Sequence, residues 1–341
     1  MRAAVALSLA VGLAGGLALA VGAACGSRTE LYVAPPDAAA IDGAPPTDAP
    51  VDAGPDVHEG MACRTDADCA DHRYCTASAK CDPTRGCVLT PRNCDDGVGC
   101  TNDTCDEKKK SCDHQADDTK CPPDQLCSVK RGCDAFVYGV ASDQHMYEVR
   151  VPTGELVDVG SSPAFASDIA LTPDGTLYST DSYVLYTTDR GDATTKAVGS
   201  ILPLHMYNGL GSRPDGTLQA TADVPVVFGV DTATAASSQI AALLDGYRAS
   251  GDLTTAAGQL FVTLTPNAGP TTDVLGLVDL NAQSTTVVGD TGVTCVWGLA
   301  TLGDVVYGLT CMGQVVSIDA ASGHATMLAQ AQPAFFGAAG R

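Results

Sequence analysis

The five letters PDGTL occur twice in the sequence, and the spacing of the two copies is the strongest constraint on the fold. They place Gly175 and Gly216 41 residues apart. Weaker copies extend the frame, with intervals of 40, 41, 42 and 46 residues between the equivalent positions Tyr138, Tyr178, Gln219, Phe261 and Tyr307. A period of this length is typical of β-propeller blades. The Asp-Gly pair in each copy predicts a hairpin turn, because glycine readily adopts the positive φ that such turns require.

Each repeat predicts four short strands, because β-branched and aromatic runs alternate with polar turns from Phe136 onward. A single four-stranded sheet has two apolar faces, whereas a ring of stacked sheets buries both. The first unit lacks its inner strand, and residues 335–340 resemble the inner strands of the other units. We therefore predict an all-β fold in which residues 134–341 form a five-bladed β-propeller that closes by pairing its two ends. A solenoid or a β-sandwich is the alternative.

Two further features of the repeat concern its architecture. The residues Val315–Asp319 read VVSID, which resembles the VYSIDxxTGxxTxVG pattern of broad propeller families. This resemblance implies the fold alone, because propellers serve many functions. The aromatic residue at the aligned position is interpreted as packing between blades.

Residues 63–133 are dominated by cysteine and predict a separate module. Large apolar residues are scarce, so crosslinks of roughly 2–4 kcal/mol each must stabilise this segment. Structural zinc sites usually contain C-x-x-C pairs, which the sequence lacks. We predict a small disulfide-rich module whose pairing is open, because twelve cysteines allow many pairings. Its cysteines are Cys63, Cys69, Cys75, Cys81, Cys87, Cys94, Cys100, Cys105, Cys112, Cys121, Cys127 and Cys133.

One part of this module carries a family resemblance. The segment Asn93–Cys121 resembles the cysteine-rich repeat of slime-mould extracellular-matrix proteins, through the motif C-T-x-D-x-C at Cys100–Cys105. It is also similar to cysteine-rich repeats in secreted proteins of social soil bacteria. The resemblance implies an extracellular spacer or interaction module. Four aspartates of this segment are candidate calcium ligands, with turn and surface roles as the alternative: Asp95, Asp96, Asp103 and Asp106.

The N-terminus predicts export. Residues 1–24 have a basic start, an apolar run and a small-residue end, as a secretory signal peptide has. Cys25 follows Gly-Ala-Ala, which resembles the bacterial lipoprotein box, in which a cysteine carries lipid after cleavage; the family usually has leucine where Gly22 stands. A retained membrane helix and ordinary cleavage after Ala20 are the alternatives. Residues 25–62 are predicted to contain the lipid anchor at Cys25 and then a disordered tether. The tether is predicted because the segment is rich in Pro, Ala and Asp.

The number of cysteines supports this interpretation. The chain has 15, and assigning Cys25 to lipid leaves twelve in the module and two in the last third, Cys295 and Cys311. A hairpin with a three-residue loop at 302–304 would place these two opposite each other, which predicts a cross-strand disulfide. Such cysteine usage belongs to an oxidising compartment. We expect a cell-envelope protein, and Gly26 favours the outer membrane by the rule known for enteric lipoproteins.

The charge of the chain excludes several classes of partner. The formal net charge is −21, and residues 134–341 contain 20 acidic against 6 basic residues. An acidic surface repels phosphate backbones and anionic lipid headgroups. We therefore expect no nucleic-acid partner and membrane contact through the lipid anchor only.

Catalytic signatures are absent from the sequence, which has no G-x-S-x-G, H-E-x-x-H or P-loop motif. Asp168, Asp252 and Asp304 could gather at the mouth of the ring and hold a metal ion, although turn roles explain them equally well. The tripeptide at 190–192 reads RGD and is expected in an exposed polar turn. We interpret it as a chance match.

These observations favour a binding or interaction protein over an enzyme. The expected partner is an unknown protein or glycan that contacts the propeller, and no cofactor, metal or catalytic residue is predicted. A metal-dependent propeller hydrolase or lyase and a passive surface spacer are the alternatives. The oligomeric state stays open.

Overall fold

The structure is a computed structural model that describes residues 59–162, 165–269 and 271–341. The predicted signal peptide, Cys25 and most of the predicted tether lie outside the described residues. Within the described ranges, no helix is long and apolar enough to cross a membrane. The helices that it does describe are the short 3-10 turns η1 (Asp66–Cys69) and η2 (Asp118–Lys120).

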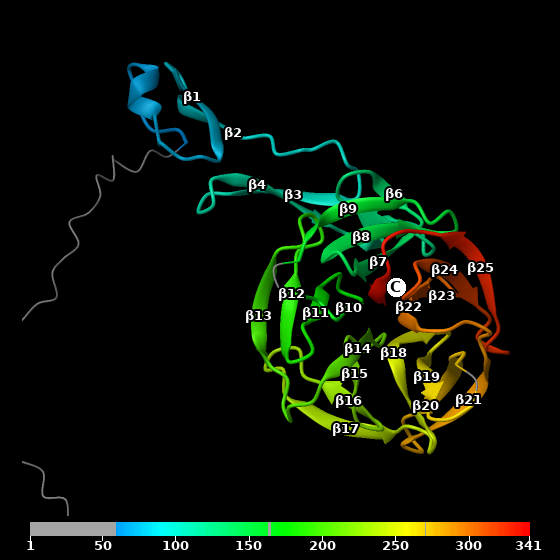
Figure 1. The fold of residues 1–341 in the computed structure, drawn as a ribbon. Coiled ribbons are helices and arrows are strands. Elements are labelled where there is room, and N and C mark those ends of the chain that lie inside the picture. The colour runs from blue at the N-terminus through cyan, green and yellow to red at the C-terminus, as the bar shows by residue number, and fades with distance from the viewer. Residues whose placement is uncertain (1–58, 163–164, 270) are drawn as a thin grey trace, which may run out of the picture. The chain divides into compact units, whose positions relative to one another are not determined.

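The chain from Phe136 onward forms five antiparallel four-stranded sheets around one axis, which confirms the predicted five-bladed propeller (Figure 1). The blades, each given from its inner to its outer strand, are as follows. Blade 1 contains β26 (Phe335–Ala339), β7 (Phe136–Ala141), β8 (His145–Arg150) and β9 (Leu156–Ser161). Blade 2 contains β10 (Asp168–Leu171), β11 (Leu177–Thr180), β12 (Val184–Thr188) and β13 (Thr195–Ser200). Blade 3 contains β14 (Tyr207–Ser212), β15 (Leu218–Ala222), β16 (Val226–Val230) and β17 (Ser237–Ala242). Blade 4 contains β18 (Tyr247–Ala256), β19 (Gln259–Pro266), β20 (Val274–Asp279) and β21 (Ser284–Asp290). Blade 5 contains β22 (Val296–Leu302), β23 (Val305–Thr310), β24 (Gln314–Ile318) and β25 (Ala325–Gln330).

The ring closes as the repeat predicts. β26 pairs with β7, with Ala338 opposite Gly139 and Ala339 opposite Tyr138. In Figure 1 the red C-terminal segment lies beside β7. The last strand of the sequence therefore completes the first blade, and no blade of the ring lacks a neighbour.

The core lies between the blades. Phe136 of blade 1 shares one apolar cluster with Leu177 of blade 2 and Leu309 of blade 5. Tyr138 and Phe261, at the aligned aromatic position, are 0% and 2% exposed. The aromatic position of the repeat is therefore a packing position, because each blade buries its two faces against its neighbours.

The last hairpin corrects one step of the sequence reasoning. Leu302 pairs with Val305, so the loop has two residues and not the predicted three, because Gly303 at φ +61° allows a tight turn. A register shift between Val296 and Gly298 then displaces the pairing by one residue. Cys295 and Cys311 consequently face each other and are joined by a disulfide.

The cysteine-rich residues form three small hairpins: β1 (Thr76–Asp82) with β2 (Gly86–Pro91), β3 (Thr101–Asp106) with β4 (Ser111–Ala116), and β5 (Leu126–Ser128) with β6 (Gly132–Asp134). All twelve module cysteines are disulfide-bonded, in the pairs 63–81, 69–87, 75–105, 94–112, 100–127 and 121–133. The bonds 75–105 and 100–127 each join one hairpin to the next. The module is therefore a chain of hairpins that are crosslinked both internally and to one another.

Candidate binding site at the propeller axis

Two carboxyl groups meet at the centre of the ring. Asp168 on β10 and Asp252 on β18 are both 0% exposed. They accept one backbone N–H from each of the five blades. Asp168 accepts from Ile169 (2.7 Å) and Leu210 (2.9 Å), and Asp252 accepts from Leu253 (2.6 Å), Leu299 (2.9 Å) and Ala338 (3.3 Å). These five donors occupy equivalent positions on the five inner strands. We call the two aspartates the axial pair.

The other three inner strands carry glycine where the axial pair stands: Gly209, Gly298 and Gly337. A Cβ added at Gly337 would collide with a carboxylate oxygen of Asp168, and one at Gly298 would lie 2.8 Å from the Cβ of Ala338. The axis has room for two carboxyl groups and for no further side chain at this level. Asp and Gly are the residues that fit at this position. Asp accepts hydrogen bonds from the otherwise unpaired N–H groups of the inner strands, and Gly leaves space for the two carboxyl groups.

This packing predicts that Gly337→Ala destabilises the propeller. The added methyl displaces the Asp168 carboxyl from its two N–H donors, so we expect a loss of about 1–3 kcal/mol, the usual cost of overpacking. The midpoint of urea unfolding measures the loss. Gly99→Ala is the matched control, because its Cβ would meet nothing within 4 Å. Equal midpoints for both variants would contradict the steric account.

Burial governs the charge of the axial pair. Burial, followed by the neighbouring charge of Asp252, raises the pKa of Asp168 well above its usual range. Burial likewise raises the pKa of Asp252. Hydrogen bonds from three backbone N–H groups and from Asp168 act in the opposite direction and lower it. We therefore place a proton on Asp168, from which it bonds Asp252. Two adjacent buried carboxyls share a proton because both cannot ionise.

The structure separates the three aspartates that could have held a metal ion together. The structure brings Asp168 and Asp252 together, whereas Asp304 lies exposed in the turn between β22 and β23. Five backbone donors and one shared proton already occupy the carboxyl oxygens of the pair. Metal ligands must present free, deprotonated oxygens, so these residues are better suited to closing the axis than to holding an ion.

A cleft of about 1120 Å³ opens on one side of the axial pair. Its floor includes the residues that stand next to the axial level on the inner strands, namely Ser167, Asn208, Trp297 and Phe336. The rings of Trp297 and Phe336 lie nearly parallel, with centroids 5.9 Å apart and planes at 28°, and both are half-buried. The floor is therefore part aromatic and part amide and hydroxyl.

Exposed apolar side chains gather on the face of the cleft. An antiparallel blade turns at alternate ends, so the connections into the inner strands and those between the second and third strands share one face. Of the nine large hydrophobic residues exposed in the described chain, six lie in these connections: Phe165, Tyr183, Leu202, Leu204, Met206 and Met312. We call this side the cleft face. Of these six, Phe165 lines the cleft, and the other five lie in loops of the same face.

Most charges in the cleft are already bonded within the protein. Asp181 accepts from the N–H groups of Tyr183 and Val184 and from Tyr186 Oη (2.8 Å). Asp273 is buried, and burial raises its pKa; it accepts from Ser250, Thr265 and the N–H of Val296. Two charged side chains of the cleft are exposed. One is Asp223, which lies 3.5 Å from His205, and the other is Arg248. The cleft lining thus contains three carboxyl groups and one guanidinium, and its two exposed charges, those of Asp223 and Arg248, are of opposite sign.

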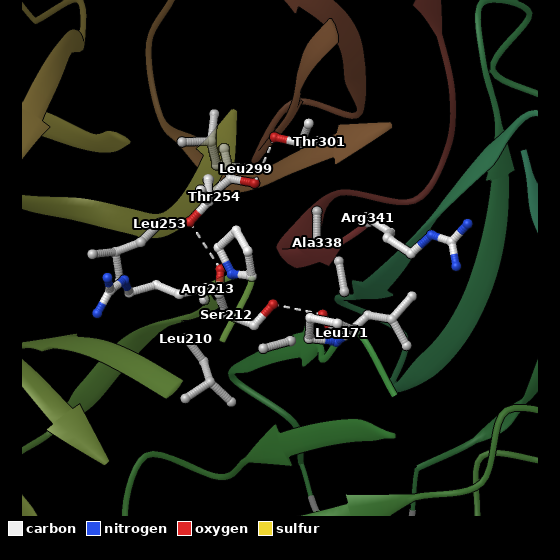
Figure 2. Close-up of a pocket in the computed structure, with 17 residues that line it drawn as sticks. Leu171, Leu210, Ser212, Arg213, Leu253, Thr254, Leu299, Thr301, Ala338 and Arg341 are labelled. Atoms are coloured by element: carbon white, nitrogen blue, oxygen red, sulfur yellow. Dashed lines mark hydrogen bonds between the residues drawn. The ribbon is translucent and has the colours of Figure 1, made fainter. Parts of the chain in front are cut away.

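A second, smaller pocket of about 240 Å³ lies at the other end of the inner strands (Figure 2). Leu171, Leu210, Leu253 and Leu299 line it, and its hydroxyl groups bond one another or the backbone. The two arginines at this pocket, Arg213 and Arg341, extend away from each other in Figure 2. Arg213 contacts Asp215 at 3.3 Å, and Arg341 donates to the carbonyl of Asp118. Nothing here converges on a ligand.

The RGD tripeptide has a structural role that the sequence did not reveal. Arg190 was expected in an exposed turn, but its side chain is only 7% exposed and forms a two-pronged bond with Asp118 at 2.7 and 2.9 Å. It also donates to Tyr138 Oη (3.1 Å), and burial raises the pKa of Tyr138 to about 12. The arginine therefore attaches η2 of the cysteine-rich module to the propeller and is not available to a receptor.

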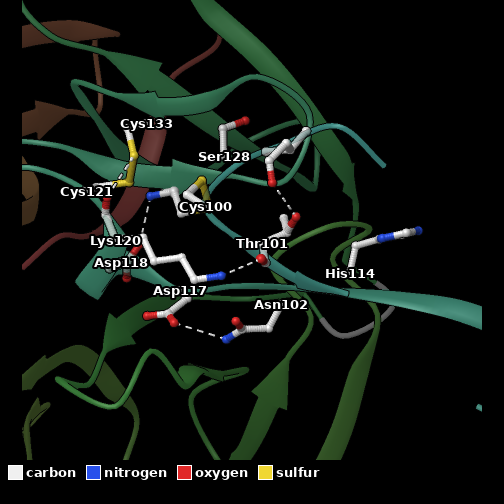
Figure 3. Close-up of a disulfide and its surroundings, with 12 residues drawn as sticks. Cys100, Thr101, Asn102, His114, Asp117, Asp118, Lys120, Cys121, Ser128 and Cys133 are labelled. Carbon is white, nitrogen blue, oxygen red and sulfur yellow. Dashed lines mark hydrogen bonds between the residues drawn. A yellow bond between two sulfur atoms is a disulfide. The ribbon is translucent and has the colours of Figure 1, made fainter. Parts of the chain in front are cut away.

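Polar bonds near Asp118 also join the hairpins of the module (Figure 3). Lys120 Nζ donates to the carbonyl of Thr101 (2.7 Å), and Asn102 donates to Asp117 (3.1 Å), so the second hairpin is bonded to η2. Glu148 of β8, with a side chain 1% exposed, accepts from Ser128 and from Arg131 at 2.9 Å. The last part of the module is thus fixed to blade 1 by buried polar bonds as well as by the chain itself.

The four candidate calcium ligands of the module have partners of their own. Asp96 and Asp103 lie 3.4 and 2.9 Å from Nδ1 of His114, a residue that the sequence reasoning missed. The bond with Asp103 raises the pKa of His114. Asp95 and Asp106 accept backbone N–H groups within their own turns. Turn roles describe Asp95 and Asp106, whereas Asp96, Asp103 and His114 bring their ligand atoms within 4.8 Å of one another, close enough to hold a metal ion.

No protein-family model matches the sequence, and no curated protein matches it significantly. Many solved structures resemble the fold at low identity. A symmetrical protein of de novo evolutionary emergence is 13% identical with a TM-score of 0.42, over 59% of this chain and 96% of that chain. A chain of a nidogen/laminin complex is 16% identical with a TM-score of 0.40, over 60% and 84%. A putative TolB from Agrobacterium tumefaciens is 16% identical with a TM-score of 0.38, over 57% and 76%. Similarity at this level assigns this chain to no family and to no activity.

Proposed function

We propose that the protein is a cell-envelope lipoprotein that binds a partner on the cleft face of its propeller. One observation carries the proposal: the axis is closed by a bonded carboxyl pair, while the cleft beside it is open and lined by Trp297, Phe336 and the exposed Phe165. A site that recognises a partner needs such a concave, partly apolar surface with a few polar groups. A hydrolytic site needs a free nucleophile, base or metal ligand, and the axial pair is engaged.

The remaining parts of the chain fit this role as proposals. Residues 1–24 direct export, Cys25 carries lipid, residues 25–62 form the tether, and residues 63–133 hold the propeller away from the membrane. The disulfides in the module suggest an oxidising extracellular or periplasmic compartment. Attachment to the outer membrane is the most specific form of this proposal.

Partner capture tests the proposed function. We expect the full chain carrying Cys25→Ser, secreted without lipid, to retain a cell-envelope component, and Trp297→Ala to lose it. Met327→Ala is the matched control, because Met327 is an exposed apolar side chain on the outer strand β25. Retention unaffected by Trp297→Ala would refute the cleft as the binding site. Stoichiometric bound metal together with hydrolytic or lyase activity would instead support the alternative that the protein is a metal-dependent enzyme. If no component is retained, the alternative of a passive surface spacer is supported.

Metabolic labelling with a fatty-acid probe tests the anchor. We expect label on the wild-type chain and none on Cys25→Ser, because the thiol of Cys25 is the proposed site of lipid attachment. Gel fluorescence of the immunopurified chain measures the label. An unlabelled wild-type chain would refute lipidation without affecting the proposal for the cleft.

A further inference from the structure

We infer that the ligand of the cleft is a neutral oligosaccharide, one of whose sugar rings stacks on Trp297 and Phe336. The inference rests on the proposed binding function and specifies the class of ligand. It follows from the aromatic cleft floor, from the opposite signs of the two exposed charges, from the free polar groups and from the lack of a free backbone edge in the cleft.

The aromatic pair offers an apolar surface at the bottom of the cleft. Trp297 and Phe336 stand at equivalent positions of neighbouring inner strands, and their planes are only 28° apart. Both rings are half-buried, so each has a face or edge that a ligand can cover. A saturated sugar ring is flat enough and carries enough C–H surface to stack on the accessible part of these rings, as apolar ring-on-ring contacts do.

The charges of the cleft argue against an ionic ligand. Asp181 and Asp273 are bonded to the protein's own donors. A cationic ligand would need free carboxylates around the aromatic rings, and an anionic ligand would be repelled by a chain with a net charge of −21. The accessible charges are one of each sign, Asp223 and Arg248. A neutral ligand with many hydroxyl groups fits a cleft that exposes only these two opposite charges.

Free polar groups lie where hydroxyl groups would meet them. Asn208 is half-buried beside the aromatic floor and uses its amide oxygen for a long contact with Thr221 (3.4 Å). No hydrogen bond within the described residues uses its Nδ2 group or the guanidinium of Arg248. Amide and guanidinium groups have fixed donor geometry, which gives specificity for hydroxyl oxygens. The volume of about 1120 Å³ exceeds that of pockets for single small molecules, which favours an oligomer.

A peptide fits the cleft less well. Extended peptides usually bind by adding a strand to a free sheet edge. At the axial level, the inner-edge N–H groups of all five blades are bonded to Asp168 and Asp252. The cleft floor therefore offers side chains to a ligand and no backbone ladder.

The chain contains one tryptophan, so its fluorescence reports directly on the aromatic pair. The full-length protein in detergent is titrated with a panel of neutral tri- to hexasaccharides of glucose, mannose, galactose and N-acetylglucosamine. We expect at least one member to give a saturable change in emission, with an affinity that does not change between ~50 and ~500 mM salt, because no ion pair forms. Calorimetry on the same ligand gives the affinity of variants that lack the tryptophan.

The variants separate stacking from folding. Phe336→Ala and Trp297→Ala should weaken the binding about tenfold or more, the equivalent of one lost stacking contact with its buried area. Trp297→Phe should retain most of the affinity, and Met327→Ala all of it, with equal thermal midpoints as the check on folding. No response to any member of the panel, or equal affinities for all variants, overturns the inference. A response to basic or acidic peptides that weakens with salt also overturns it, yet leaves the proposed binding function standing if Trp297→Ala abolishes that response.

Discussion

Replacing Arg190 by alanine is expected to lower the free energy of unfolding by about 3–5 kcal/mol, the usual cost of removing one partner of a buried ion pair. The variant leaves the Asp118 carboxylate, 2% exposed, without the two bonds that balance its charge. The carboxylate of Asp118 keeps only its bond from the N–H of Cys127, and Tyr138 loses its donor. The midpoint of urea unfolding measures the loss.

The location of the pair predicts a second effect of the same substitution. Because Asp118 lies in η2, hydrogen exchange should increase in residues 118–134 before it increases in the blades. Arg213→Ala is the matched control: Arg213 contacts Asp215 at 3.3 Å, but both side chains are well exposed, so we expect a change below about 1 kcal/mol. If the two variants unfold at the same urea concentration, Arg190 does not attach the module to the propeller.

Replacing Asp252 by asparagine is expected to destabilise the propeller by about 3–5 kcal/mol, and replacing Asp168 by asparagine by about 1–2 kcal/mol. Both substitutions replace a carboxyl group by an amide. They differ because Asp168 carries the shared proton in the wild-type protein and Asp252 does not. Asp168 carries the shared proton, so an amide at that position still donates to Asp252. An amide at position 252 removes the charge that accepts three backbone N–H groups and directs its own donors toward them.

The pH dependence of stability provides an independent test of the same assignment. Because burial raises the folded-state pKa of Asp168, its contribution is fully present below the unfolded value of about 3.9 and is lost as the pH rises toward the folded-state pKa. The slope from this group reaches about 1.4 kcal/mol per pH unit. Asp168→Asn lacks this term, so its deficit relative to wild type should shrink from pH 4 to pH 7. Equal losses for the two variants, with a constant difference across this range, would show that the pair carries no shared proton.

Much of the architecture could be predicted from the repeat. The four intervals between equivalent positions, beginning with that from Tyr138 to Tyr178, predicted the length of a blade. The first unit lacked an inner strand, and this predicted that residues 335–340 close the ring. These features are visible in a sequence because strand alternation and turn chemistry act between near neighbours. The turn at 302–304 was predicted one residue too long. The register shift between Val296 and Gly298 compensates for this in the pairing of the cysteines, and it could not be recognised in the sequence.

The candidate site was predicted less well, although one signal was present. The inner strands, once aligned, show Asp168, Gly209, Asp252, Gly298 and Gly337 in one column. A column that takes only Asp or Gly indicates a place where five backbones converge, and it distinguishes these aspartates from Asp304. The sequence analysis grouped the three by charge alone and therefore left a metal site and turn roles as equal alternatives. Trp297 was treated as part of a strand, since nothing local distinguishes a floor residue from a packed one.

The sequence by itself determined the class of the protein: an all-β ring of five blades, preceded by a module that depends on disulfides. Tertiary structure alone decided which cysteines pair, that Arg190 binds Asp118 across 72 residues of sequence, and that two carboxyl groups close the axis. The physical reason is distance along the chain. Strand and turn preferences are local and repeat with the blade, whereas contacts at the axis and between hairpins arise only when the ring brings remote residues together.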